Sequence, residues 1–286
     1  MNRSIQAVLF DLGDTLMYSP NPWPSVHELA GRTLSASLCA HGIEVDNATF
    51  YMEFRQRLDR YYADRDRNLV ETTTLAVLEE LLDDLGQSDV PYETLRRSLD
   101  TFYGVTQQNW MIEDDATTVL MALQQAGMHL GLVSNAGDER DVLKLVENFG
   151  IGRYFDFVLT SAGCGYRKPH PHIFGVALAQ WGYMPDEIAM VGDRLDADIG
   201  GDRLGKVALE IAHHGGHRGG AGGFEAAVKL QVVELAGDGC AEADAHAGPG
   251  EQRGIKRRIR QRLAHGVRGQ LPRADAVSVW VSGHEV

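Results

Sequence analysis

An α/β fold, a doubly wound parallel sheet with an inserted all-helical domain, is predicted by three features of this sequence. A short apolar run near the N-terminus, residues 5–10, ends at a carboxylate. Residues 18–108 carry helical periodicity with no strand pattern between the helices. From residue 114 onward, helical patterns alternate with short apolar runs, which is the order found in parallel sheets covered by helices on both faces.

The first strand is expected over residues 5–10, because an almost unbroken apolar run is typical of a strand buried on both faces. It stops at Asp11, and Gly13, Asp14 and Thr15 are residue types that favour turns. The sequence therefore places a carboxylate at the carboxyl end of a central strand, where open α/β sheets bind their ligands.

Four helices are expected between this strand and residue 108, behind a proline-rich linker over residues 18–24. Apolar residues recur at three- and four-residue steps, and Gly, Pro or Asn stands at most of the expected helix ends. The predicted helical segments cover residues 26–38, 47–61, 75–85 and 91–105. We interpret residues 18–108 as a helical domain inserted behind the first strand.

The second half of the chain supplies the remaining strands of the sheet. Helices are expected over residues 119–126, 142–149 and 173–181, and strands over residues 128–133, 155–159, 188–191 and 207–211. With the first strand, these elements define the sheet-bearing domain, residues 1–17 and 109–211. Residues 212–286 form an atypical tail, rich in glycine and then in basic residues, with a composition typical of disorder.

The composition is that of an ordinary globular enzyme. The 286 residues carry a net charge of -13, which argues against nucleic acid as a partner, because phosphate backbones attract Lys and Arg. The cysteines, Cys39, Cys164 and Cys240, are widely spaced and are read as reduced thiols. Neither a signal peptide nor a membrane-spanning segment is recognisable, so we expect a cytoplasmic protein with no membrane partner.

Carboxylates follow two of the predicted strands. Asp11 follows the first strand, and Asp193 and Asp198 follow the strand over residues 188–191. Because the carboxyl ends of parallel strands lie along one edge of a sheet, these carboxylates are expected to converge. Mg²⁺ prefers such hard oxygen ligands, so Asp11, Asp193 and Asp198 are candidate metal ligands.

Other polar residues at this edge suit a phosphoryl group. Asp11 is a candidate nucleophile that would form an aspartyl-phosphate. Lys168 is a compact positive charge that would keep Asp11 ionised and balance the phosphate. Ser134 and Asn135 follow a strand and are candidate hydrogen-bond donors to phosphate oxygens. The sequence therefore predicts a site for a divalent cation and a phosphoryl group at this edge.

Four motifs in order resemble the haloacid dehalogenase (HAD) superfamily of phosphohydrolases. They are the Asp-bearing first strand, Ser134-Asn135, Lys168 in Arg-Lys-Pro, and the segment from Gly192 to Asp198. The resemblance covers about residues 7–201. It implies a phosphatase that uses Mg²⁺ and acts on a small phosphorylated metabolite. It also implies a Rossmann-like core, Asp11 as nucleophile, a metal contact from the Gly13 backbone carbonyl, and a mobile C1-type helical cap that sets substrate choice.

One departure from the family pattern concerns proton transfer. Family phosphatases commonly carry a second Asp two residues after the nucleophile as general acid and base, whereas this chain has Gly13 there and Asp14 one place later. General acid–base catalysis contributes roughly 10²–10⁴-fold. We therefore expect slow turnover of alkyl phosphates and better turnover of aryl or acyl phosphates, with Gly13→Asp as the gain-of-function test. Whether Asp14 replaces the missing acid stays open.

Two alternatives and one further hypothesis remain. A haloacid dehalogenase also uses an Asp nucleophile, but its chemistry dispenses with the metal that Asp193 and Asp198 would hold. A non-catalytic phosphate-binding or partner-binding protein is the alternative from another class. Finally, the chain departs from the family after about residue 202, which suggests an altered reading frame or a divergent extension and a sheet lacking a proper edge.

Overall fold

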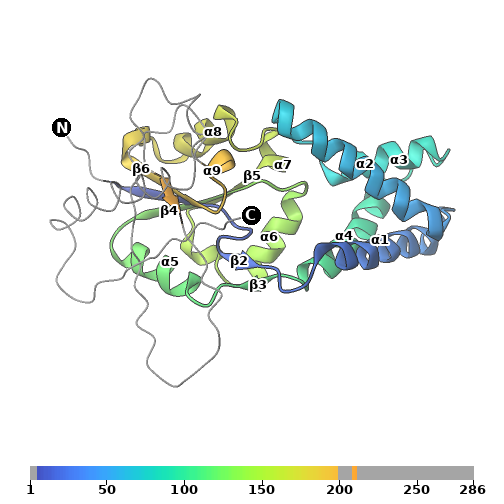
Figure 1. Ribbon diagram of the computed structural model, residues 1–286, viewed down its shortest axis with the longest axis horizontal. Helices are drawn as coiled ribbons and strands as arrows, with labels where there is room; N and C mark the ends of the chain where they lie inside the picture. Colours follow the sequence, from blue (N-terminus) through green and yellow to red (C-terminus); the bar gives the residue numbers. More distant parts are fainter. Residues whose placement is uncertain (1–4, 199–207, 211–286) are drawn as a thin grey trace, which may run out of the picture.

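The computed structural model describes residues 5–198 and 208–210. The tail over residues 212–286, its histidines and its basic run lie outside the described residues, as does most of the segment assigned to an altered reading frame. The described elements form two groups, a sheet unit at one end of the molecule and a unit of four long helices at the other (Figure 1). No helix of the described residues is long and apolar enough to cross a bilayer.

The sheet unit contains five parallel strands in the order β5-β4-β1-β6-β7. Their bounds are β1 (Ala7–Phe10), β4 (His129–Ser134), β5 (Phe157–Thr160), β6 (Ile188–Gly192) and β7 (Ala208–Glu210). The predicted fold class is confirmed. β7, which pairs with β6, falls within the strand expected over residues 207–211, so the described residues supply an edge strand on that side.

The register of the sheet aligns the ends of its central strands. Phe10, the last residue of β1, pairs with Leu132 of β4 on one side and with Val191 of β6 on the other. Neighbouring strands therefore end near the same level, and the residues that follow them emerge at one edge. β4 and β5 lie on one side of β1, and β6 and β7 lie on the other, so the strand order switches direction beside β1. Sheets of this kind usually bind their ligands at the carboxyl end of such a switch point.

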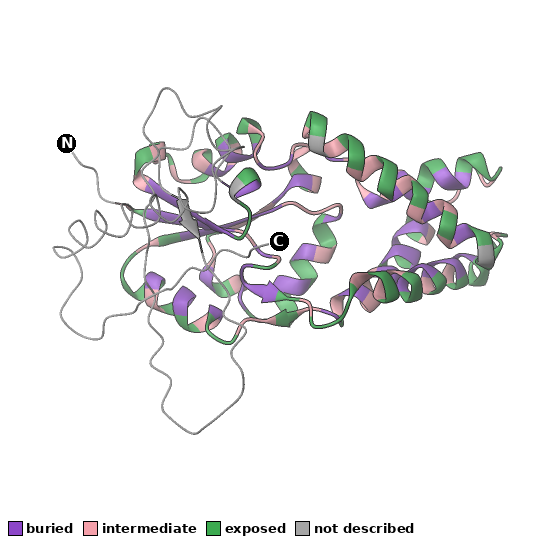
Figure 2. Ribbon diagram, viewed as in Figure 1, coloured by how far each residue is buried: buried purple, intermediate pink, exposed green. Residues whose placement is uncertain are grey.

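Helices cover both faces of the sheet, and the alternation of β1 explains why. Val8 and Phe10 belong to an apolar cluster with α5 (Ala116–Gln125) and α6 (Glu139–Asn148), whereas Ala7 and Leu9 pack in a second cluster with α8 (Pro171–Trp181). Figure 2 shows the strands buried between the two helical layers. The short elements are α7 (Ser161–Cys164), α9 (Leu195–Asp198) and the 3₁₀ turns η1 (Gly152–Tyr154) and η2 (Pro185–Glu187).

The helical unit consists of α1 (Trp23–Ala40), α2 (Asn47–Asn68), α3 (Thr74–Asp84) and α4 (Tyr92–Gln107). It has an apolar core of its own, built from all four helices around Leu34, Phe54 and Leu99. Two boundaries differ from the sequence expectation. α1 begins at Trp23, because Pro24 is accommodated in the first turn of a helix. α2 continues to Asn68, where its charged surface residues pair within the helix.

Two chain crossings connect the units and lie side by side. The strands β2 (Met17–Tyr18) and β3 (Met111–Ile112) pair in an antiparallel ribbon. Next to it, Asn21 Nδ2 donates to Asn109 Oδ1 at 3.0 Å, and Asn109 Nδ2 donates to the Asn21 carbonyl at 3.1 Å. The helical unit is thereby attached beside the sheet edge that carries Asp11.

Candidate active site

Three carboxylates meet at the carboxyl edge of the sheet. Asp11 follows β1, Asp193 follows β6 and Asp198 lies in α9. Each offers an oxygen, and these oxygens all lie within 4.8 Å of one another. Gly192 permits this approach, because a Cβ at that position would stand 2.0 Å from Asp198 Oδ2. An all-oxygen donor set of this size fits a divalent cation such as Mg²⁺.

Lys168 lies in the middle of this acidic group and is almost completely buried. Its Nζ is 2.9 Å from Asp11 Oδ1 and 2.6 Å from Asp198 Oδ1. Burial alone lowers the pKa of a lysine, but the carboxylates of Asp11 and Asp198 outweigh it, so the pKa of Lys168 lies above its ordinary value. The ammonium is therefore charged at neutral pH and is positioned to balance negative charge at Asp11.

Asp193 is the most exposed of the three carboxylates. Partial desolvation, together with the negative charges of Asp11, Asp198 and Asp14, raises the pKa of Asp193 to about 7. One ammonium does not neutralise this concentration of negative charge. The electrostatics of the edge therefore favour the binding of a further cation.

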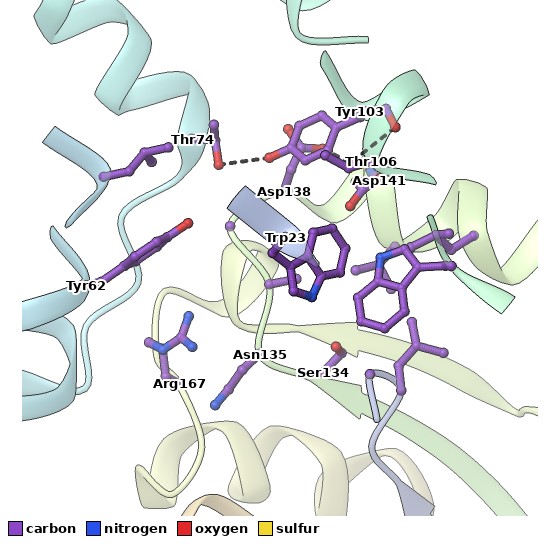
Figure 3. Close-up of a pocket in the computed structure, with 18 of the residues that line it drawn as sticks. Trp23, Tyr62, Thr74, Tyr103, Thr106, Ser134, Asn135, Asp138, Asp141 and Arg167 are labelled. Atoms are coloured by element: carbon purple, nitrogen blue, oxygen red, sulfur yellow. Dashed lines mark hydrogen bonds between the residues drawn. The ribbon is translucent and has the colours of Figure 1, made fainter. Parts of the chain in front are cut away.

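Asn135 contacts the main chain of Lys168. Its Oδ1 accepts a hydrogen bond from the Lys168 backbone N–H at 2.7 Å, and its Nδ2 donates to the Lys168 carbonyl at 3.0 Å. The carboxamide thus holds the Lys168 main chain beside the end of β4. Ser134 ends β4 and lines the same cavity as Asp11 (Figure 3). Phosphate binding by Ser134 and Asn135 stays a prediction.

Gly13 and Asp14 follow Asp11 along the cavity wall. Asp14 has a φ of 55°, a left-handed conformation that Asp tolerates better than most residues, and its side chain is exposed. Its charge contributes to the raised pKa of Asp193, so its carboxylate acts on the same site. Metal contact by Gly13 and acid–base catalysis by Asp14 stay predictions.

A buried cluster around Glu71 supports the site and escaped the sequence analysis. The Glu71 carboxylate accepts hydrogen bonds from Tyr61 and Ser161 and pairs with Arg167, the neighbour of Lys168. Ser161 Oγ also accepts from the Ala136 N–H at 2.9 Å. Glu71 lies between α2 and α3, so this cluster joins the helical unit to the loops after β4 and β5. Glu71 and Arg167 are too far apart in the sequence for any local pattern to predict that they pair.

A cavity of about 440 Å³ lies between the two units and contains the acidic edge. Figure 3 shows Trp23 and Tyr62 from the helical unit facing Ser134 and Asn135 from the sheet unit. Trp23 lines the cavity, whereas Tyr18 and Tyr166 are not among the residues that line it, and Tyr166 stacks on His170 with ring centroids 4.2 Å apart.

Two carboxylates, Asp138 and Asp141, stand at the start of α6. Asp138 caps α6 by accepting from the Asp141 N–H at 3.1 Å. Asp141 instead lines the cavity, and its Oδ1 accepts from Gln107 Nε2 at 2.8 Å. Burial, with a contribution from the nearby Asp138 charge, raises the pKa of Asp141 from 3.8 to about 7.

Asp141→Asn is expected to change how stability depends on pH. A carboxyl whose folded pKa is raised binds its proton more tightly in the folded state, so wild-type stability is lost as the pH rises from about 4 to about 7. Asp141→Asn has no carboxyl group to lose a proton, so it lacks this loss of stability. Its free energy of unfolding should exceed that of the wild type by up to about 4 kcal/mol at pH 8, and the difference should shrink toward pH 4.

Urea unfolding at a series of pH values measures this difference. Glu80→Gln, which removes an exposed carboxylate of α3, is the matched control and should leave the pH profile unchanged. Parallel pH profiles for Asp141→Asn and the wild type would contradict the prediction.

Known proteins match this chain over most of its length. A family model described as haloacid dehalogenase-like hydrolase matches residues 5–201. The chain is 30% identical over 210 residues to the glyceraldehyde 3-phosphate phosphatase of Methanopyrus kandleri, covering 72% of this chain and 84% of that protein. It is 30% identical over 199 residues to the enzyme of the same name from Pyrococcus abyssi, covering 69% and 76%.

A solved structure shares the fold. The 2-haloacid dehalogenase from Pseudomonas syringae pv. Tomato DC3000 matches with a TM-score of 0.55 at 22% identity, covering 72% of this chain and 86% of that chain. At this level of identity the match concerns the fold alone.

Proposed function

Because the chain belongs to the haloacid dehalogenase-like hydrolase family, as a hydrolase of phosphate esters, we propose that it is a Mg²⁺-dependent phosphatase of a small phosphorylated metabolite. The observation that carries the proposal is the placement of Lys168 between Asp11 and Asp198, with Asp193 beside them in one cavity. A nucleophile, its counter-charge and a cation site are thereby gathered around one point.

Asp11 acts as the nucleophile. One of its carboxylate oxygens attacks phosphorus, the ester oxygen leaves with its electron pair, and an aspartyl-phosphate forms; water then hydrolyses this acyl phosphate and regenerates Asp11. Lys168, held by Asn135, pairs with Asp11 and balances the charge of the phosphoryl oxygens. The Ser134 hydroxyl donates a hydrogen bond to a phosphoryl oxygen.

Asp11, Asp193, Asp198 and the Gly13 carbonyl would hold the Mg²⁺. When bound, it supplies positive charge that stabilises negative charge developing on the phosphoryl group. The retained acidic pair also speaks against the dehalogenase alternative, because that reaction has no need of a cation site.

In this proposal the four helices α1–α4 act as a cap. The cap covers residues 18–108, which lie in the sequence between the two parts of the sheet unit. Their inner surface contributes Trp23 and Tyr62 to the cavity wall opposite Ser134 (Figure 3). A substrate bound at Asp11 would therefore contact side chains of the helical unit with its leaving group. Substrate choice then depends on the helical unit, whereas the phosphoryl chemistry depends on the sheet unit.

The proposal is tested by phosphate release from a panel of phosphate esters, with EDTA and with added Mg²⁺. The panel includes glyceraldehyde 3-phosphate, for which the two relatives are named, and alkyl, aryl and acyl phosphates. We expect activity with Mg²⁺ and at least a roughly 100-fold loss with EDTA. We also expect alkyl esters to be slower than aryl or acyl phosphates, by up to roughly 10²–10⁴-fold, because Gly13 supplies no acid.

Two outcomes would contradict the proposal. Activity unchanged by EDTA would remove the cation from the mechanism, and the absence of phosphate release from every ester would favour a phosphate-binding role. Equal efficiency on alkyl and aryl esters would show instead that Asp14 or another group supplies the proton. Asp14→Asn would then slow the alkyl esters selectively, since their alkoxide leaving groups need protonation most.

A further inference from the structure

Two tryptophans face each other where the chain passes between the sheet unit and the helical unit. Trp23 begins α1, and Trp110 lies between α4 and β3. Their ring centroids are 5.0 Å apart with planes inclined by 59°. Two hydrogen bonds between Asn21 and Asn109 hold together the two chain segments that carry these tryptophans. We call Trp23 and Trp110 the aromatic wall.

The aromatic wall lies beside the proposed nucleophile. Gly13 is two residues beyond Asp11, and an ideal Cβ at Gly13 would lie 3.4 Å from Cη2 of Trp110. The indole therefore occupies the side of the cavity toward which a side chain at this position would point. Gly13, where this chain departs from the family pattern, is therefore also the position against which the Trp110 indole lies.

Only part of the ring surface of the wall is covered by the protein interior, where Trp110 packs against the apolar cluster of α5 and α6. Trp23 and Trp110 are each only partly buried, and both line the cavity that contains Asp11. His27 stacks on Trp23 at a centroid distance of 5.2 Å, which supports Trp23 from within α1. A planar group attached to a phosphoryl group at Asp11 would share this cavity with the two rings.

We propose, resting on the phosphatase function above, that the aromatic wall binds an aromatic leaving group and that Trp110 is the specificity-determining residue for aryl and arylmethyl phosphate esters. Aromatic pairs contribute beyond their buried area by an amount equivalent to roughly 2–10-fold in binding. This recognition is distinct from the leaving-group effect of Gly13, because it depends on ring contact and not on the acidity of the departing alcohol.

The experiment separates ring contact from leaving-group acidity by comparing benzyl phosphate with cyclohexylmethyl phosphate. Both esters release a primary alcohol of similar size, so only the aromatic ring differs. We expect the wild type to favour benzyl phosphate in kcat/KM by about 5-fold or more, mainly through KM. Trp110→Leu should abolish this preference, and Trp110→Phe should keep most of it.

Trp181→Phe is the matched control. Trp181 packs against Phe157 in the apolar cluster beneath α8 and does not line the cavity, so its replacement should leave the preference unchanged. A Trp110→Leu variant that keeps the wild-type preference would overturn the proposal and leave Trp110 as a packing residue between the units.

A second measurement needs no variant and no turnover. Phenylphosphonate and cyclohexylphosphonate are compared as ligands of the wild type through quenching of tryptophan fluorescence in the presence of Mg²⁺. Tighter binding of phenylphosphonate supports the aromatic wall even if no ester is hydrolysed, in which case only the phosphatase function fails. Equal binding of the two overturns the aromatic wall, while phosphate release from other esters would leave the phosphatase function standing.

Discussion

Asp11→Asn is expected to lower kcat for phosphate release by at least about 10⁴-fold, the largest effect predicted for any substitution in this protein. The carboxamide oxygen is a poor nucleophile, and no neighbouring carboxylate takes over the position at the end of β1. The fold should persist, because Lys168 keeps Asp198 as an ion-pair partner at 2.6 Å when the charge of Asp11 is removed. Initial rates with Mg²⁺ and the thermal unfolding midpoint measure both expectations.

Asp196→Asn is the matched control for this substitution. Asp196→Asn also removes one carboxylate charge, but the Asp196 carboxylate is exposed and pairs with Arg194. Its rate should stay within about twofold of the wild type, as expected for an exposed ion pair. Residual activity of Asp11→Asn above about a tenth of the wild type would contradict the assignment of the nucleophile.

Asp138→Asn is expected to destabilise the protein by about 3–5 kcal/mol, the largest stability effect among these predictions. Arg96 Nη1 of α4 lies 2.5 Å from Asp138 Oδ2, and both side chains are about 95% buried. Removing the carboxylate leaves the Arg96 guanidinium buried with only the more exposed Asp100 at 3.3 Å. Because Arg96 lies in α4 and Asp138 caps α6, this substitution weakens the contact between the helical unit and the sheet unit.

The design distinguishes charge from capping. Asparagine is as good an N-cap as aspartate, so Asp138→Asn isolates the ion pair, whereas Asp138→Ala should cost roughly a further 1 kcal/mol through the lost cap of α6. Combining Asp138→Asn with Arg96→Met should recover part of the loss, since no unpaired charge remains. Guanidinium unfolding of the three variants measures the differences.

Asp100→Asn is the control for Asp138. Asp100 also contacts Arg96, but its side chain is 46% exposed, so its removal should cost less than about 1 kcal/mol. If Asp138→Asn and Asp100→Asn are equally mild, the Arg96–Asp138 pair contributes little and the two units are held together by their other contacts.

Local sequence patterns were sufficient for the long helices and the main strands of the sheet. Continuous apolar runs located β1, β4, β5 and β6, and glycines or prolines located most helix ends, because these signals lie within one element. The short strands β2 and β3 carried no such pattern. The grouping of Asp11, Lys168, Asp193 and Asp198 followed from the parallel sheet, since such strands end along one edge. Where polar segments continued a helix, as at the end of α2, the pattern was too weak to mark the boundary.

By itself, then, the sequence determined the fold class and the residues that carry the proposed chemistry, because both depend on short-range pattern and on the order of strands. Only the tertiary structure decided that Asn135 holds the Lys168 backbone, that Glu71 pairs with Arg167, that Asp141 is partly buried in the cavity, and that Trp110 lies against Gly13. These contacts join residues from different elements, and which side chains meet there depends on how the helical unit packs against the sheet unit.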